Sequence, residues 1–123
     1  MLTKSLFYIF VGGGLGSVAR FLVSSYTQKL WNLHAFPLGT LVVNITGCFV
    51  MGMLSAYFLK MDGSLKFLLI TGFCGGYTTF STFSAENFSL WQNGNYGILI
   101  FYILLSVLLG VLAVFLGFQA INR

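Results

Sequence analysis

Four long apolar stretches, separated by short polar connections, dominate this sequence of 123 residues. Only 7% of its residues are charged and 58% are hydrophobic, whereas a soluble domain carries about 25% charged residues. A soluble domain of this size buries only about 60–70% of its chain surface, so it could not remove so much apolar surface from water. The sequence therefore predicts a single domain, residues 1–123, that lies in a lipid bilayer.

Each apolar stretch is long enough to cross a membrane as a helix, which takes about 20 residues. The expected spans are residues 6–26, 38–59, 67–90 and 97–118. The connections are too short to hold a binding site of their own. The predicted fold is an all-α membrane protein with four transmembrane helices, and we expect its function to reside among them.

The third stretch contains a run of small and polar residues, GFCGGYTTFSTFSAEN, at positions 72–87. Its glycines, Gly72, Gly75 and Gly76, make a continuous helix costly and a backbone interruption cheap. Channels and transporters use backbone groups freed in this way to bind ions. We therefore expect the third helix to be broken at this glycine-rich stretch, with the carbonyls of Gly75 and Thr78 available to a cation. A glycine-rich helix crossing without an ion would explain the same residues.

Hydroxyl side chains alternate with phenylalanines after the glycines. Phe80 and Phe83 are three residues apart and share a helix face. Ser81 and Thr82 belong to polar stripes beside them. A polar stripe inside a membrane indicates a wet or ion-bearing path, although such hydroxyls also bond back to the preceding helical turn.

The groups available to such a path favour an anion. Cation pathways usually show carboxylates, and the apolar stretches hold only Glu86, near a span end. Phenyl ring edges, the amide of Asn44 and hydroxyl protons can together solvate a small anion. Tyr102 and Ser106 could extend this polar track. Arg20 would add positive potential or line a vestibule, unless its side chain extends to the membrane surface.

Several function classes are poorly supported. Six cations spread over four spans form no surface for nucleic acid. One histidine and two acids give no metal-ligand spacing and no base placed to activate a serine, so we expect no enzyme activity. A bundle of four helices has little interior, so we expect a homo-oligomer, most simply a dimer. The distribution of basic residues slightly favours both termini in the cytoplasm.

Three motifs resemble the Fluc (CrcB) family of fluoride channels, and the resemblance covers essentially the whole chain. GGGLGSVARF is similar to the family's glycine-rich first span ending in arginine, GTLVVNITGCF to its second span with Asn44 in place, and GFCGGYTTFSTF to its broken third span. Ser17 stands where alanine is common and Phe21 where tyrosine is common.

The resemblance implies a passive, fluoride-selective channel that exports fluoride across the plasma membrane of a microbe and relieves its toxicity. It implies an antiparallel, dual-topology homodimer with paired pores and no other protein partner. It also implies a structural Na⁺ at the dimer centre, held by the carbonyls of Gly75 and Thr78 and not transported. The implied pore residues are Asn44, Phe80, Phe83, Ser81, Thr82, Tyr102 and Ser106, with Arg20 as a vestibule or structural charge.

Two other functions fit a chain with four spans. A small proton-coupled drug exporter would depend on a membrane-buried carboxylate in its first span, which this sequence lacks. An accessory subunit of a larger membrane complex would show no ion flux when purified.

Overall fold

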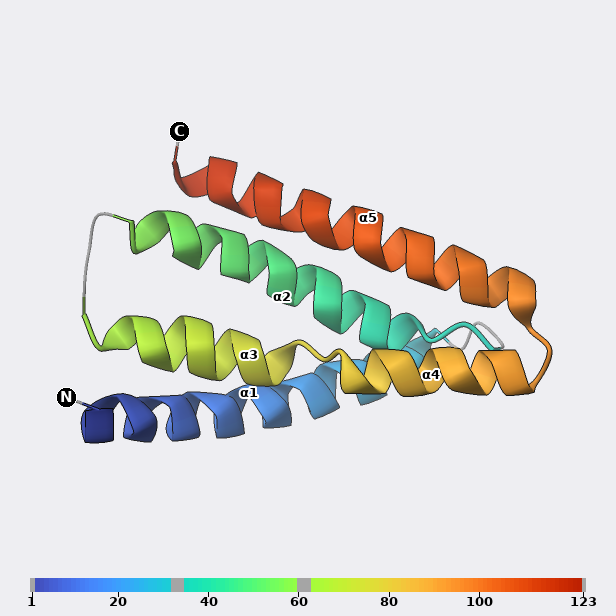
Figure 1. The fold of residues 1–123 in the computed structure, drawn as a ribbon, viewed down its shortest axis with the longest axis horizontal. Helices are drawn as coiled ribbons and strands as arrows, with labels where there is room; N and C mark the ends of the chain where they lie inside the picture. The colour runs from blue at the N-terminus through green and yellow to red at the C-terminus, as the bar shows by residue number, and fades with distance from the viewer. Residues whose placement is uncertain (1, 32–34, 60–62, 123) are drawn as a thin grey trace.

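The computed structural model describes residues 2–31, 35–59 and 63–122, and all regular structure in these residues is helical (Figure 1). Among these residues, three helices are long and apolar enough to cross a membrane: α1 (Leu2–Leu30), α2 (Leu38–Tyr57) and α5 (Tyr96–Ile121). Between α2 and α5 lie the π-helical segment η1 (Phe67–Cys74), the short α3 (Gly75–Tyr77) and α4 (Ser81–Gln92). The all-helical class predicted from the sequence is confirmed for this part of the chain.

The third apolar stretch is divided into two helical parts by an extended link, visible between α3 and α4 in Figure 1. Thr78 has extended backbone angles (φ −78°, ψ 156°) and ends the first part, and α4 begins at Ser81. Gly75 keeps helical angles (φ −63°, ψ −39°). The interruption therefore lies at residues 78–80, just after the glycines rather than at them, which corrects the position expected from the sequence.

The glycines before the interruption instead allow the chain to approach α1 closely. A Cβ atom at Gly12 would overlap the carbonyl oxygen of Leu68, and a Cβ at Gly76 would overlap the backbone of Gly13. Small residues that let two helix backbones approach are typical of helix contacts in membranes. Helix propensity predicts that these glycines interrupt the helix, but in the structure they allow close packing against α1.

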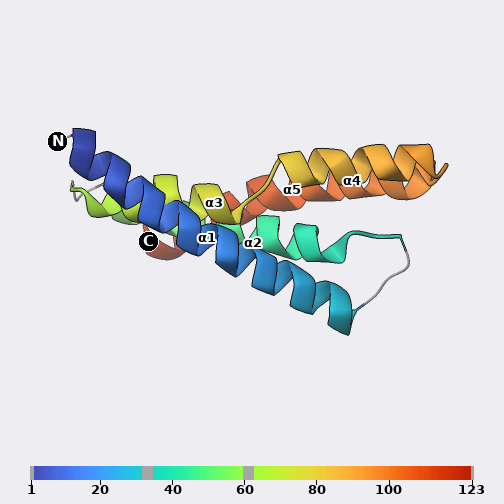
Figure 2. The ribbon, with the colours of Figure 1, turned by 90° about the horizontal axis from the view of Figure 1, so that it is seen from below.

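The interruption lets the third stretch change neighbours. Before it, η1 and α3 pack against α1; after it, α4 packs against α5. Figure 2 shows α4 diverging from α1 beyond the link. The change of partner places residues 78–80 beside α2, in the middle of the molecule.

The contact between α2 and α5 is the most extensive in the fold and also depends on glycine. A Cβ at Gly52 would overlap the carbonyl oxygen of Val114, and a Cβ at Gly117 would overlap that of Phe49. The two helices run in the same direction, side by side (Figure 1). Neither backbone can move away without losing the contacts on both sides of this crossing.

Replacing Gly52 by alanine should therefore destabilise the protein by about 1–3 kcal/mol, because the added methyl group forces the two backbones apart. Thermal unfolding in detergent measures the effect. Gly97→Ala is the matched control, since a Cβ at this position in α5 meets nothing within 4 Å. A Gly52→Ala variant that unfolds at the wild-type temperature would contradict the prediction.

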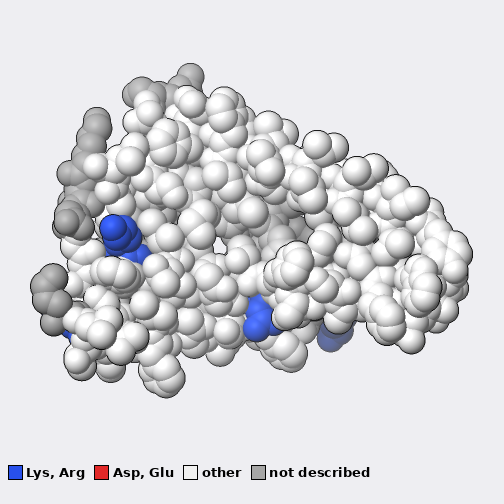
Figure 3. All heavy atoms as spheres, viewed as in Figure 1, with Lys and Arg blue, Asp and Glu red and all other residues white. Residues whose placement is uncertain are grey.

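The outer surface is apolar, as a lipid environment requires. Large hydrophobic side chains such as Phe10, Phe21 and Val111 are more than half exposed. Figure 3 shows a face with few basic and no visible acidic side chains. Exposure of this surface to water would be unfavourable, whereas lipid or a second protein copy would cover it.

Candidate functional site

The interruption at residues 78–80 is held in place by Asn44 on α2. The Asn44 Nδ2 donates to the carbonyl of Thr79 at 3.1 Å, and Asn44 Oδ1 accepts the Thr79 N–H at 2.8 Å. These bonds satisfy backbone groups that lipid cannot solvate. An amide carries two N–H donors, so one of them remains for another acceptor.

The same arrangement frees two carbonyl groups. In a continuous helix each N–H donates to the carbonyl four residues earlier. The Thr79 N–H would then reach Gly75, but it donates to Asn44. The Thr82 N–H would reach Thr78, but it donates to Thr79 Oγ1 at 3.2 Å. The carbonyls of Gly75 and Thr78 therefore lack the amide partners that a helix would supply. These are the two carbonyls that the sequence predicts to be available to a cation.

Arg20 lies at the same interruption. Its Nε donates to the carbonyl of Gly76 at 3.2 Å, from α1 to the end of α3. A positive charge near the last carbonyls of a helix is favourable, because it offsets their partial negative charge. Arg20 thus stabilises the helix end that the interruption creates.

A groove of about 300 Å³ lies beside the interruption, between α2, α4 and α5. Four of the predicted pore residues line it: Asn44, Phe80, Phe83 and Ser106. The remaining lining residues are Cys48, Thr78, Thr79, Val107 and Gly110. The Ser106 Oγ is buried and has no hydrogen-bond partner among the described residues. A buried hydroxyl without a partner indicates a ligand, ion or water at that place.

The two phenylalanines of the groove differ in their surroundings. Their ring centroids are 6.1 Å apart. Phe83 also contacts the ring of Tyr102, with centroids 5.0 Å apart. Phe80 is 79% exposed. One ring is therefore fixed by its own chain, while the other projects from it.

Tyr102, Ser81 and Thr82 do not line the groove. Tyr102 is fully buried and its hydroxyl donates to Glu86 Oε1 at 2.9 Å. Ser81 is exposed, and Thr82 is half-buried. Of the hydroxyl residues predicted to form a polar track, only Ser106 therefore lies beside Phe80 and Phe83 in the groove.

Glu86 forms a polar cluster that the sequence did not reveal. The Thr40 Oγ1 donates to Glu86 Oε2 at 2.7 Å, opposite the bond from Tyr102. A carboxylate inside an apolar stretch is expensive and usually functional or paired. Its rarity was the available signal, but the partners lie on two other helices and could not be identified from spacing.

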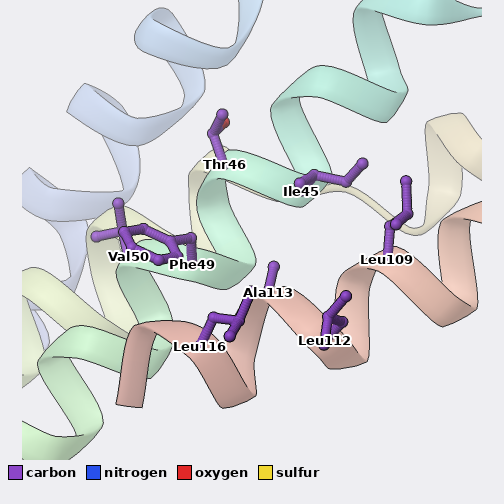
Figure 4. A pocket seen from close by; sticks show the side chains of 8 residues that line it. All are labelled: Ile45, Thr46, Phe49, Val50, Leu109, Leu112, Ala113 and Leu116. Carbon is purple, nitrogen blue, oxygen red and sulfur yellow. The ribbon is translucent and has the colours of Figure 1, made fainter. Parts of the chain in front are cut away.

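A second pocket, of about 410 Å³, lies between α2 and α5 (Figure 4). Its lining is apolar apart from one threonine: Ile45, Thr46, Phe49, Val50, Leu109, Leu112, Ala113 and Leu116. The Thr46 hydroxyl donates to the carbonyl of Val42, at 2.7 Å, within its own helix. This pocket therefore offers an ion little besides apolar side chains.

Known proteins similar to this chain also indicate a role in ion transport. The family described as "CrcB-like protein, Camphor Resistance (CrcB)" matches residues 7–118. The fluoride-specific ion channel FluC of Azobacteroides pseudotrichonymphae is 49% identical over 118 residues, which cover 94% of each chain. The protein of the same name from Flavobacterium psychrophilum is 48% identical and covers 93% of this chain and 94% of its own. The chain belongs to the CrcB family and is a multi-pass membrane protein of a microbe rather than an enzyme.

Proposed function

We propose that this chain is a passive, fluoride-selective channel that lets fluoride leave the cytoplasm of a microbe and so relieves its toxicity. The names of its relatives support fluoride as the ion. The observation that carries the proposal is the groove, where the unpartnered Ser106 hydroxyl lies with the remaining Asn44 N–H donor. The ring edges of Phe80 and Phe83 carry partial positive charge and add to these donors. None of the residues lining the groove is charged, so it suits a small anion without trapping it.

The functional unit in this proposal is an antiparallel, dual-topology homodimer with paired pores. A single chain leaves Phe80 largely exposed at the groove. Fluoride beside lipid would lose its solvation, so the groove needs a second protein surface to close it. A second copy of the chain would supply this surface and cover part of the apolar exterior.

A structural Na⁺ at the dimer centre completes the proposal. Gly75 and Thr78 fit such an ion, since both carbonyls lack their helical amide partners. Gly75 is exposed, so its backbone can meet a second copy. Hard cations prefer oxygen ligands. When bound, the ion would stabilise the partial negative charge of these carbonyl oxygens and link the interruptions of the two copies. It would not be transported.

Purified protein in liposomes loaded with potassium fluoride tests the proposed function. After valinomycin is added, a fluoride electrode should record fast fluoride release, and a parallel run with potassium chloride should show no chloride release. Release of neither ion from folded, dimeric protein would contradict the channel and favour an accessory subunit. Release of both ions would contradict fluoride selectivity.

Glu86→Gln separates the channel from a proton-coupled exporter, which the half-buried Glu86 would otherwise suit. The glutamine amide can accept from one neighbouring hydroxyl and donate to the other, and Glu86 does not line the groove. We expect fluoride release within about tenfold of wild type, the effect of one weakened hydrogen bond. Complete loss of transport by the folded variant would support proton coupling instead.

A further inference from the structure

A pair of hydroxyl groups joins α2 to the last helical residue before the interruption. Tyr77 ends α3, and its hydroxyl lies 2.9 Å from Thr46 Oγ1. The Thr46 Oγ1 also lies 2.7 Å from the carbonyl of Val42, an acceptor that takes its single proton. Tyr77 is therefore the donor to Thr46, and the bond has one direction.

The ring of Tyr77 is fixed as well as its hydroxyl. It is stacked on Phe73, with centroids 5.8 Å apart and ring planes 10° from parallel. On the α2 side it occupies space that Gly47 leaves open, because a Cβ there would overlap Thr78 and crowd the Tyr77 ring. A side chain that is 9% exposed and held in this way has little freedom to point elsewhere.

Thr78 therefore lies between two consecutive links to α2. Before it, Tyr77 bonds to Thr46; after it, Thr79 bonds to Asn44. With both neighbours fixed to one rigid helix, the carbonyl of Thr78 has a defined place. The Thr78 N–H and Oγ1 also donate to the carbonyl of Cys74, at 3.0 and 2.9 Å, which ties Thr78 to the helix before it. The bond from Tyr77 to Thr46 in turn ties the end of that helix to α2.

We propose that Tyr77 and Thr46 are positioning residues that hold the Thr78 carbonyl in the geometry needed for the central cation. This inference rests on the proposed Na⁺ site. Thr46 does not line the ion groove; it borders the apolar pocket, and Figure 4 shows its side chain pointing away from α5. Neither Tyr77 nor Thr46 touches the groove directly, so the pair acts through the position of Thr78.

Loss of this hydroxyl pair should weaken Na⁺ binding while leaving the groove intact. One neutral hydrogen bond contributes enough to change a binding constant roughly 2- to 10-fold. In Tyr77→Phe and Thr46→Val, the Na⁺ concentration for half-maximal fluoride release should rise by that factor. Release at saturating Na⁺ should remain at the wild-type rate. A loss of general packing would instead lower the rate at every Na⁺ concentration.

The experiment is a Na⁺ titration at constant ionic strength on the full-length protein, with two readouts: fluoride release from liposomes and the unfolding temperature in detergent, which rises when an ion binds the folded state. The double variant should shift no further than either single variant. Thr46→Ser keeps the hydroxyl and should restore the wild-type titration. Tyr57→Phe is the control, because Tyr57 is 48% exposed on α2 and far along the helix from Thr46.

The outcomes separate the inference from the proposed function. Wild-type titrations in Tyr77→Phe and Thr46→Val would overturn the positioning role alone. Wild-type protein that responds to Na⁺ in neither readout would overturn the ion and the inference together. Wild-type protein that binds Na⁺ by unfolding temperature but releases no fluoride would overturn the channel, while the variants would still be judged by the unfolding titration.

Discussion

Asn44→Ala should reduce fluoride release at least about 100-fold. The change removes both hydrogen bonds to Thr79 and an amide that lines the groove. A buried backbone group left without a partner costs about 1–3 kcal/mol, and here an N–H and a carbonyl are left bare together. The liposome assay measures release per amount of folded protein, so that lost protein is not counted as lost activity.

Asn44→Asp tests the amide donors of this residue while keeping the bond from the Thr79 N–H. The carboxylate keeps the oxygen that accepts the Thr79 N–H but removes both amide donors and places negative charge in the groove. We expect folded protein without fluoride release. Asn93→Ala, in the exposed turn after α4, is the control and should behave as wild type. Wild-type release by folded Asn44→Ala would show that the interruption and the groove do not need this amide.

Hydropathy predicts helices in this chain because a segment in lipid must satisfy its own backbone hydrogen bonds. The start of α2 at Leu38 follows the same local chemistry: Pro37 has no N–H to donate and suits a helix beginning. These properties depend on neighbours in sequence. They can therefore be read without knowledge of the tertiary structure.

The position of the interruption could not be predicted in this way. Glycine propensity points to residues 72–76, but two of these glycines, Gly72 and Gly76, are needed where the chain packs against α1. The interruption forms instead where Asn44, 35 residues away in sequence, offers partners to Thr79. A long-range side chain therefore decides the outcome, and local propensity contains no information about it.

For the predicted ion site, the sequence indicates which residue types are suitable but not where their side chains point. Residue chemistry predicts an ion path from Asn44, Phe80, Phe83 and Ser106, and the structure places these residues in one groove. Tyr102 is of the right type and on a suitable helix, but its hydroxyl is directed to Glu86. The direction of a side chain depends on partners from other helices, so the sequence alone cannot distinguish a groove residue from a packed one.

Replacing Phe80 or Phe83 with isoleucine should cut fluoride release at least about tenfold in each case, because the substitution keeps apolar bulk and removes a polarised ring edge. The structure separates the two variants by stability. Phe83→Ile should unfold at a lower temperature, since it loses the ring contact with Tyr102, worth about 1 kcal/mol. Phe80→Ile should not, because Phe80 is 79% exposed within its chain.

Comparing the two variants separates an effect on fluoride release from an effect on stability. If the rings act on the anion, Phe80→Ile gives a stable chain with impaired release, a combination that lost packing within the chain does not produce, because Phe80 is 79% exposed there. Size-exclusion chromatography of the variant checks that its oligomeric state is unchanged. Phe88→Ile on the same helix is the matched control, since Phe88 is 56% exposed and does not line the groove. Unchanged release in both Phe80→Ile and Phe83→Ile would reduce these residues to packing, and the selectivity of the groove would then have to come from Asn44 and Ser106.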